Sequence, residues 1–329
     1  MKKIHWGIIS TAKIGIEKVI PAIQKGTHCE VVAIASRNKE QAEKAAAQLN
    51  IPTVYDSYEA LLQDKQVDAV YIPLPNHLHV EWAIKALQAG KHVLCEKPVG
   101  LSVAEAQTLQ TAAQQYPQQK IMEAFMYRFH PQWQLALQMV KEEAIGTLQT
   151  VHSFFSFYNT DPNNIRNKKE MGGGAMMDIG CYCLSLARYL FGKEPLSIIG
   201  KVDWDKAWGT DRISSGIISF DNGTSTFTCS TQIMPYQRVQ IIGTSGRIEI
   251  EIPFNAPPDK PTKLWLHTSK GTKETIFPIT DQYTLEADAF AQSIVNNTQV
   301  PTPLADSIQN MKLMEAFFKS AEEGREVKL

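Results

Sequence analysis

The sequence has few cysteines, no excess of charge and no long apolar run, and each absence excludes a class of protein. Its five cysteines are an odd number without paired spacing, and Cys181-Tyr182-Cys183 is neither a metal knuckle nor a redox motif. A net charge of −1 creates no field that would gather nucleic acid. No window is long enough to span a membrane, and the apolar residues 4–9 are too few for a signal-peptide core. We therefore expect a cytoplasmic protein with reduced thiols that binds neither nucleic acid nor membrane.

The remaining composition is that of an ordinary globular protein. Hydrophobic residues make up 43% and charged residues 20% of the chain. A single hydrophobic core stops growing at roughly 250 to 300 residues. The 329 residues therefore predict two domains.

The first 125 residues alternate short β-branched runs with helical patterns, which is typical of repeated strand-helix-strand units. Helical patterns at 40–49 and 78–89 separate some of these runs. The pattern predicts an α/β fold with a Rossmann-type, doubly wound parallel sheet. The expected strands are residues 4–10, 30–36, 53–55, 68–72, 91–95 and 120–124.

Capping residues support two of the helices. Asn76 is expected to cap the helix that ends at Gly90, and Ser102 with Glu105 forms a capping box after Pro98.

After residue 125 the pattern changes to longer alternating strands, at 148–158, 212–220 and 224–233, the last two joined by Asp221-Asn222-Gly223. These strands predict an α+β domain with an open, mainly antiparallel sheet built as a meander. We place the dinucleotide-binding domain at residues 1–125 and the substrate-binding and oligomerisation domain at 126–329. The final helical stretches, 285–296 and 305–323, are able to pack back on the first domain.

A degenerate dinucleotide fingerprint follows the first strand. Of the three glycines in G-x-G-x-x-G only Gly15 is present, and Ser10 and Ala12 replace the others. Small residues still allow the backbone to approach a pyrophosphate, whose charge the amides of a helix N-terminus stabilise. The alternative is a tight turn without a ligand. The expected cofactor contacts here are Ser10, Thr11, Ala12, Lys13 and Ile14.

The end of the second strand indicates which dinucleotide is bound. A fold that prefers NAD places a carboxylate there, whereas this chain has Ser36 and Arg37. A guanidinium and a hydroxyl suit a 2′-phosphate, so the sequence favours NADP(H) over NAD(H). The alternative is that Arg37 is an ordinary solvated charge.

Two further loops follow the fourth and fifth strands. The first contains Pro73, Leu74, Asn76 and His77, which we expect at the cofactor; His77 and His79 do not share a helix face, so no metal site is predicted. The second is Glu96-Lys97-Pro98, which places a cation at the sheet edge where such folds bind ligands. The alternative is a strand followed by a turn with a solvated lysine.

The second domain contains a glycine-rich entry into a helix, residues 172–182. Asp178 and Tyr182 lie one helical turn apart and share a face, so both could reach one substrate hydroxyl together with Lys97. The alternative is a helix N-terminus with Asp178 well placed in the first turn and Tyr182 half buried.

Together these motifs resemble the glucose-fructose oxidoreductase, inositol dehydrogenase and rhizopine-catabolism family, Gfo/Idh/MocA. The resemblance covers nearly the whole chain. It rests on residues 6–12, 36–37, 73–79, 89–98, 127–131 (Tyr-Arg-Phe-His-Pro) and 172–182. Tyr182 stands where many members have histidine. This is typical of the branch of dimeric dihydrodiol dehydrogenases and NADP-dependent xylose dehydrogenases.

The resemblance implies Lys97, Tyr182 and Asp178 as catalytic residues, and it adds Glu96, Lys97 and Arg128 to the cofactor contacts. It also implies a homodimer or homotetramer formed through the C-terminal sheet. Asp178 would bind a substrate hydroxyl or orient the lysine.

The predicted reaction is oxidation of a carbinol carbon in a sugar, polyol or trans-dihydrodiol by NADP. Tyr182 would accept the hydroxyl proton, with Lys97 stabilising its phenolate. Asn159, Asp161 and Arg166 are candidate substrate contacts. Two alternatives stay open: reduction of a carbonyl, imine or enone, and a non-catalytic NADP-binding sensor. Substrate identity and physiological direction are not predicted.

Overall fold

A computed structural model describes residues 2–329 and divides the chain into two compact units. The first unit comprises the chain up to Met126 together with Gln282–Ile308. The second comprises Tyr127–Asp281 and Gln309–Leu329.

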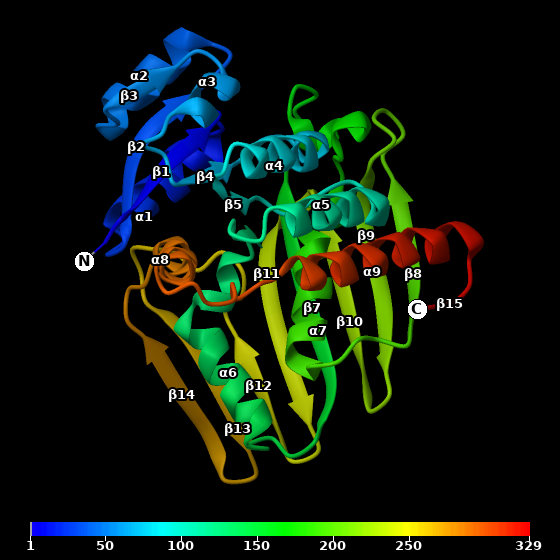
Figure 1. The fold of residues 1–329 in the computed structure, drawn as a ribbon. Coiled ribbons are helices and arrows are strands. Elements are labelled where there is room, and N and C mark those ends of the chain that lie inside the picture. The colour runs from blue at the N-terminus through cyan, green and yellow to red at the C-terminus, as the bar shows by residue number, and fades with distance from the viewer. Residues whose placement is uncertain (1) are drawn as a thin grey trace. The chain divides into compact units, whose positions relative to one another are not determined.

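Within residues 2–329 the first unit holds a six-stranded sheet in the order β3-β2-β1-β4-β5-β6, and every pair in it is parallel (Figure 1). This arrangement confirms the predicted doubly wound fold, and the strand ends differ from the prediction by at most one residue. The apolar runs are continuous because such strands are buried on both faces. The strands are β1 (Ile4–Ile9), β2 (Cys29–Ala35), β3 (Thr53–Tyr55), β4 (Ala69–Ile72), β5 (His92–Cys95) and β6 (Ile121–Glu123).

The connecting segments of the first unit are mostly helical. They are the π-helical turn η1 (Gly15–Val19), α1 (Ile20–Lys25), α2 (Lys39–Leu49), α3 (Tyr58–Gln63), the 3₁₀ turn η2 (Asn76–Leu78), α4 (His79–Gln88) and α5 (Val103–Gln115). Another 3₁₀ turn, η3 (Met126–Phe129), follows β6.

Capping explains where several of these helices begin. The side chain of Ser102 accepts from the amide of Glu105, as predicted, and the carboxylate of Glu105 accepts from the amide of Leu101 at 2.7 Å. The predicted cap at Asn76 is wrong, because Asn76 lies inside η2 and α4 begins after Leu78 without a side-chain cap.

Helix α8 (Gln282–Val295) belongs to the first unit although it is distant in sequence. It packs on α1, its Phe290 ring lies 5.7 Å from the buried Trp6 ring, and its Asp288 accepts from the amides of Thr27 and His28. These contacts tie a late segment to the start of β2.

The second unit has a nine-stranded sheet, counted over residues 2–329, in the order β14-β13-β12-β11-β7-β10-β9-β8-β15. Its strands are β7 (Leu148–Tyr158), β8 (Ser197–Trp204), β9 (Asp211–Phe220), β10 (Gly223–Ser230), β11 (Gln232–Gly243), β12 (Gly246–Ile250), β13 (Thr262–Thr268), β14 (Gly271–Phe277) and β15 (Val327–Lys328).

Two details correct the predicted meander. Strand β7 pairs parallel with β10, which a long connection separates from it in sequence. The later strands β10 and β11 lie on either side of β7. The strand predicted at 224–233 ends at Ser230, and Gln232 already opens β11. The remaining pairs are antiparallel, so the mainly antiparallel sheet is confirmed.

Helices cover one face of this sheet (Figure 1). They are α6 (Pro131–Lys141), α7 (Cys181–Phe191) and the later part of α9 (Leu304–Glu323), and Phe317 of α9 packs on Phe227 of β10. The short turns η4 (Ile165–Asn167), η5 (Lys169–Met171) and the π-helical η6 (Met176–Gly180) precede α7.

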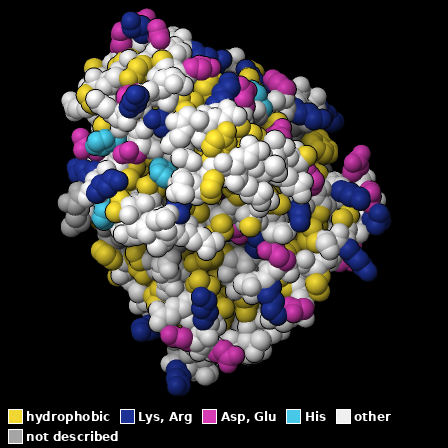
Figure 2. All heavy atoms as spheres, in the orientation of Figure 1, with side chains coloured by type: hydrophobic (Ala, Val, Ile, Leu, Met, Phe, Trp, Pro, Cys, Tyr) yellow, Lys and Arg dark blue, Asp and Glu magenta, His cyan; other side chains and the backbone are white. Residues whose placement is uncertain are grey.

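Charges of both signs are interspersed on the face drawn in Figure 2, as the net charge of −1 leads one to expect. No helix formed by residues 2–329 is long and apolar enough to cross a lipid bilayer.

Candidate functional site

The carboxyl ends of the parallel strands gather most of the predicted cofactor residues on one edge of the first unit. In the order β3-β2-β1-β4-β5-β6, strands β1 to β3 are added toward one edge of the sheet and β4 to β6 toward the other, so the strand order reverses between β1 and β4; doubly wound sheets bind ligands at such a switch point. Ser10 follows β1, Pro73 follows β4 and Glu96 follows β5. The topology alone therefore brings these loops together.

The turn after β1 is built around Ser10. Its φ of 109° is one that glycine adopts more readily, and the buried hydroxyl accepts from the amide of Ala12 at 3.2 Å and donates to the carbonyl of Pro73 at 3.4 Å. The first bond of the following helix runs from Ile16 N to Ala12 O. The amides just before Ile16 lie outside that ladder, which is how a helix N-terminus offers donors to phosphate.

The turn after β2 holds Ser36 and Arg37. The buried Ser36 hydroxyl accepts from the amide of Asn38, whose own side chain caps α2. Arg37 is exposed, and its guanidinium bonds to the Tyr58 phenol, where it opposes the rise in the pKa of Tyr58 that burial causes. The turn thus presents a cation beside a helix start.

The loops after β4 and β5 are joined by buried polar contacts. The ring nitrogens of His79, which is fully buried, lie 2.7 Å from the carbonyl oxygens of Leu74 and Pro98, and burial lowers the pKa of His79 to about 4. Tyr71 donates to the Glu96 carboxylate at 2.7 Å. Lys97 lies between Glu96 and Pro98, the two residues that make these contacts. Its side chain is half buried, and its peptide bond to Pro98 is cis.

A buried acid that sequence reasoning missed lies near this edge. Glu286 of α8 is 2% exposed, and burial, with the negative charge of Glu96 second, raises its pKa well above the usual range. Glu286 and Glu96 also both raise the pKa of Tyr71, for which burial is the main cause. Nothing in the sequence signals this contact, because α8 is remote from β4 and β5 along the chain.

In the second unit, η6 and α7 carry Asp178 and Tyr182. The Asp178 carboxylate lies 2.6 Å from Nε of Arg166, and its side chain is 14% exposed. The backbone of Arg166 also accepts from the amide of Gly174 at 2.8 Å. The structure therefore brings together a predicted catalytic acid and a predicted substrate residue as an ion pair.

Tyr182 is 4% exposed and lies among aromatic rings. The centroids of Tyr127, Phe155 and Phe254 are 5.8, 5.8 and 5.5 Å from its own. Such packing restricts the phenol to a narrow range of positions.

The structure places the other predicted residues as follows. Arg128 donates to the hydroxyl of Ser185 at 2.7 Å and lies over the ring of Tyr189, so its guanidinium has partners within the second unit. Asn159 and Asp161 each accept from a nearby backbone amide, which shapes their loop. Thr11 donates to Gln41, and Lys13 forms an exposed ion pair with Glu17.

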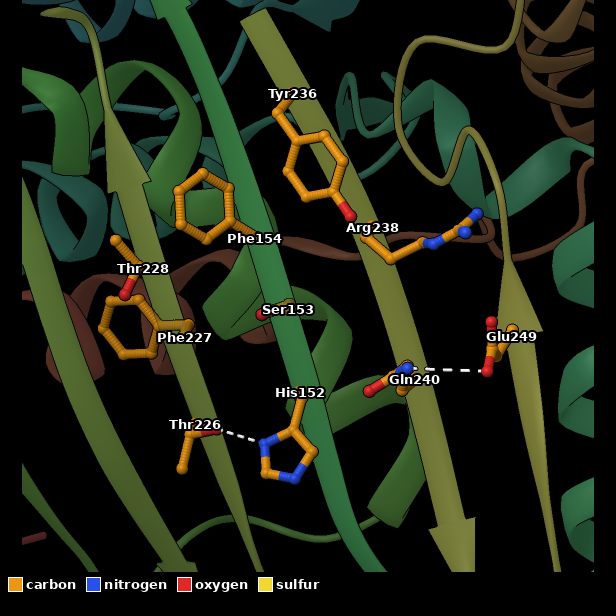
Figure 3. Close-up of a pocket in the computed structure, with 10 residues that line it drawn as sticks. All are labelled: His152, Ser153, Phe154, Thr226, Phe227, Thr228, Tyr236, Arg238, Gln240 and Glu249. Atoms are coloured by element: carbon orange, nitrogen blue, oxygen red, sulfur yellow. Dashed lines mark hydrogen bonds between the residues drawn. The ribbon is translucent and has the colours of Figure 1, made fainter. Parts of the chain in front are cut away.

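A hollow of about 480 Å³ lies elsewhere, on the open face of the sheet (Figure 3). Side chains of β7, β10, β11 and β12 line it, among them His152, Phe154, Tyr236 and Arg238. None of the predicted catalytic residues lines this hollow. Within residues 2–329 no group of three or more His, Cys, Asp or Glu side chains could hold a metal.

Comparison with known families decides the class. Residues 4–125 match an oxidoreductase family with an NAD-binding Rossmann fold, and residues 133–249 match the GFO/IDH/MocA C-terminal domain. The chain belongs to the GFO/IDH/MocA oxidoreductase family. The resemblance read from its motifs is confirmed, and so is the assignment to the oxidoreductases.

Individual proteins match most or nearly all of the chain. A D-xylose 1-dehydrogenase (NADP(+)) of Haloferax volcanii is 39% identical over 98% of this chain and 99% of its own. A trans-1,2-dihydrobenzene-1,2-diol dehydrogenase of Xenopus tropicalis is 33% identical over 80% and 77%. A 3-ketoreductase from Actinomadura kijaniata, solved with NADP and TDP-benzene, superposes with a TM-score of 0.91 at 27% identity, covering 97% and 98% of the two chains.

Proposed function

We propose that this oxidoreductase is an NADP-dependent dehydrogenase that oxidises the carbinol carbon of a sugar, polyol or trans-dihydrodiol. The main support is the full-length similarity to a D-xylose 1-dehydrogenase (NADP(+)), at 39% identity. The chain also carries Lys97, Asp178 and Tyr182, which the family resemblance implies as catalytic residues. An aldose oxidised at its anomeric carbon is the first substrate to test.

The residues after β1 and β2 fit NADP. Ser10 takes a glycine-like φ without needing glycine, and the helix that follows offers its first amides. At the end of β2, Ser36 and Arg37 stand where a carboxylate would favour NAD. When NADP is bound to this unit, its nicotinamide would supply the hydride acceptor.

Tyr182 accepts the proton of the substrate hydroxyl in this proposal. A free phenol titrates near pH 10, roughly, so at neutral pH it needs a cation that stabilises the phenolate. We assign that role to Lys97. As the C–H bond passes its electron pair to the acceptor, the O–H bond breaks toward Tyr182 and the carbinol becomes a carbonyl.

Asp178 orients the substrate in this scheme. Its carboxylate forms an ion pair with Arg166, and that pair restricts the directions in which the carboxylate can point. Arg166 is accordingly assigned to substrate binding, together with Asn159 and Asp161.

The test is NADPH formation from NADP by the purified protein, across aldopyranoses, inositols and trans-dihydrodiols, with Lys97→Met alongside. Turnover that disappears in the variant supports the proposal. Tight NADPH binding with no turnover of any substrate, in either direction, would contradict the dehydrogenase proposal and favour the non-catalytic NADP-binding sensor.

Reduction of a carbonyl is the second candidate. It is favoured by the 3-ketoreductase fold match and by a dTDP-3,4-didehydro-2,6-dideoxy-alpha-D-glucose 3-reductase of Streptomyces violaceoruber, 32% identical over 89% of this chain. NADPH consumption with keto sugars that exceeds NADP reduction with all carbinols would decide for it.

We also propose a cytoplasmic homodimer or homotetramer that forms through the open face of the second-unit sheet. Ile199 and Ile217 are neighbours on adjacent strands there and are 42% and 45% exposed, and Tyr236 is 54% exposed. Sedimentation of Ile217→Asp should give monomers, whereas Ile165→Asp, at an exposed residue outside the sheet, should not. An unchanged oligomer in Ile217→Asp would exclude this face.

A further inference from the structure

The helix that carries Asp178 and Tyr182 begins without a capping side chain of its own. Its first hydrogen bond runs from the amide of Asp178 to the carbonyl of Gly174, at 3.2 Å, so Gly174 occupies the capping position. Helices usually place Ser, Thr, Asp or Asn there, because the side-chain oxygen accepts from an amide of the first turn. Glycine cannot do so. The first amides of this helix therefore need an acceptor from another segment.

Asp211, the first residue of β9, supplies that acceptor. Its Oδ2 accepts from the amide of Met176 at 2.7 Å and from the hydroxyl of Ser214 at 2.6 Å, and the amide of Ala175 bonds to the same carboxylate. Asp211 is 2% exposed, and Ser214 is fully buried. The contact is thus an enclosed one between a strand and a helix start.

Gly174 makes room for this carboxylate. A Cβ at this position would lie 1.9 Å from Oδ1 of Asp211, and the φ of Gly174 is 114°, a value that other residues rarely adopt. Any larger residue at position 174 would therefore collide with the Asp211 carboxylate.

The same turn is tied to the ion pair of Asp178. The amide of Gly174 donates to the carbonyl of Arg166, whose side chain meets the Asp178 carboxylate. A shift of the first turn would therefore move Asp178 and its partner, and Tyr182 follows one turn later on the same helix.

We propose that Asp211 is a positioning residue, whose carboxylate fixes the first turn of this helix and through it the places of Asp178 and Tyr182. The inference rests on the proposed function, in which those two side chains act on substrate.

The test compares Asp211→Asn with Asp221→Asn, which changes an exposed carboxylate in the β9–β10 turn that pairs with the surface Lys193. Amide hydrogen exchange of the segment 174–182 and steady-state kinetics are measured on both, with kcat expressed per NADPH-binding site. In Asp211→Asn we expect exchange to become about tenfold faster and kcat to fall about 10- to 100-fold, with a larger primary deuterium isotope effect. NADPH affinity should stay unchanged. Asp221→Asn should match the wild type.

Unchanged exchange in Asp211→Asn would overturn the proposal, as would faster exchange with unchanged kcat and isotope effect. If Asp211→Asn does not fold, Ser214→Ala replaces it, since that variant removes one donor and keeps the carboxylate; the same changes, smaller, are expected. If the wild type turns over no substrate, the proposed function fails separately, and the exchange rates still decide whether Asp211 holds the turn.

Discussion

The two units organise their functional residues in opposite ways. In the first, the predicted cofactor residues come from separate loops, and a parallel sheet aligns those loops because its strands all end at one edge. In the second, Asp178 and Tyr182 come from one helix, and side chains distant in sequence, Arg166 and Asp211, hold its start. Topology positions the first set, and individual contacts position the second.

The difference predicts unequal sensitivity to substitution. In the first unit several contacts, such as those of His79 and Tyr71, together hold the loops that carry the predicted cofactor residues, so losing one contact should leave the loops in place. The helix start in the second unit is held by the Asp211 carboxylate and by contacts of Arg166, so loss of Asp211 removes a large share of what holds it.

The largest effect is expected from Tyr182→Phe. Removing the phenolic oxygen eliminates the proposed proton acceptor while keeping the ring among Tyr127, Phe155 and Phe254. We expect kcat to fall about 10²- to 10⁴-fold, with NADPH binding unchanged in a fluorescence titration. Retention of more than half the activity would remove Tyr182 from the mechanism.

Asp211 should give the second unit a distinctive dependence of stability on pH. Burial raises its pKa from 3.8 to about 7, so the folded protein holds a proton there that the unfolded chain loses between these values. The free energy of unfolding should therefore fall as pH rises from about 4 to 7, by roughly 4 kcal/mol at most, and level off above. Urea unfolding of the wild type and Asp211→Asn at several pH values measures this.

The difference in free energy of unfolding between the wild type and Asp211→Asn should shrink from about pH 4 to 7, because the asparagine amide does not titrate. Burial raises the pKa of the Cys229 thiol, which lies near Asp211, well above the usual range, so this thiol stays neutral throughout. A difference that is constant with pH would contradict the buried titration.

Arg37→Asp tests the first unit. Losing a charge-assisted contact of roughly 1.5 to 3 kcal/mol to the 2′-phosphate should weaken NADP binding about 10- to 100-fold and favour NAD. The ratio of kcat/KM for the two dinucleotides measures this preference, and Lys39→Asp, an exposed cation nearby on α2, is the control. Equal ratios in Arg37→Asp and wild type would reject the assignment.

Ser102→Ala should have the smallest effect. It removes the cap of α5 and should cost about 1 kcal/mol of stability. Because β5 and its neighbours still align the loops, kcat and cofactor affinity should not change. A loss of activity comparable to that of Asp211→Asn would mean that the first unit is no more tolerant than the second.

The sequence predicts the first unit well because its signals are local. Continuous apolar runs, the Ser102 cap and the Glu96-Lys97-Pro98 turn each depend on neighbouring residues, and the parallel topology follows from their alternation. The wrong cap at Asn76 shows the limit: Asn76 is the first residue of a 3₁₀ turn, and α4 begins only after Leu78.

The second unit is less predictable because contacts between distant segments shape it. The parallel pairing of β7 with β10 depends on where later strands insert. Asp211 looks like any acid at a strand start, and Glu286 like any acid on a helix; only the fold shows that one meets Met176 and the other lies near Glu96. The pairing of Arg166 with Asp178 has no pattern in the sequence either.

The proposed function requires direct transfer of hydrogen from a carbinol carbon to NADP. The most direct test incubates the enzyme with NADP and D-xylose deuterated at C1, and weighs the nicotinamide product by mass spectrometry. We predict one deuterium per NADPH formed, with about 10²- to 10⁴-fold less deuterated NADPH from Tyr182→Phe over the same interval. NADPH without deuterium, or deuterium released to water, would contradict hydride transfer from that carbon.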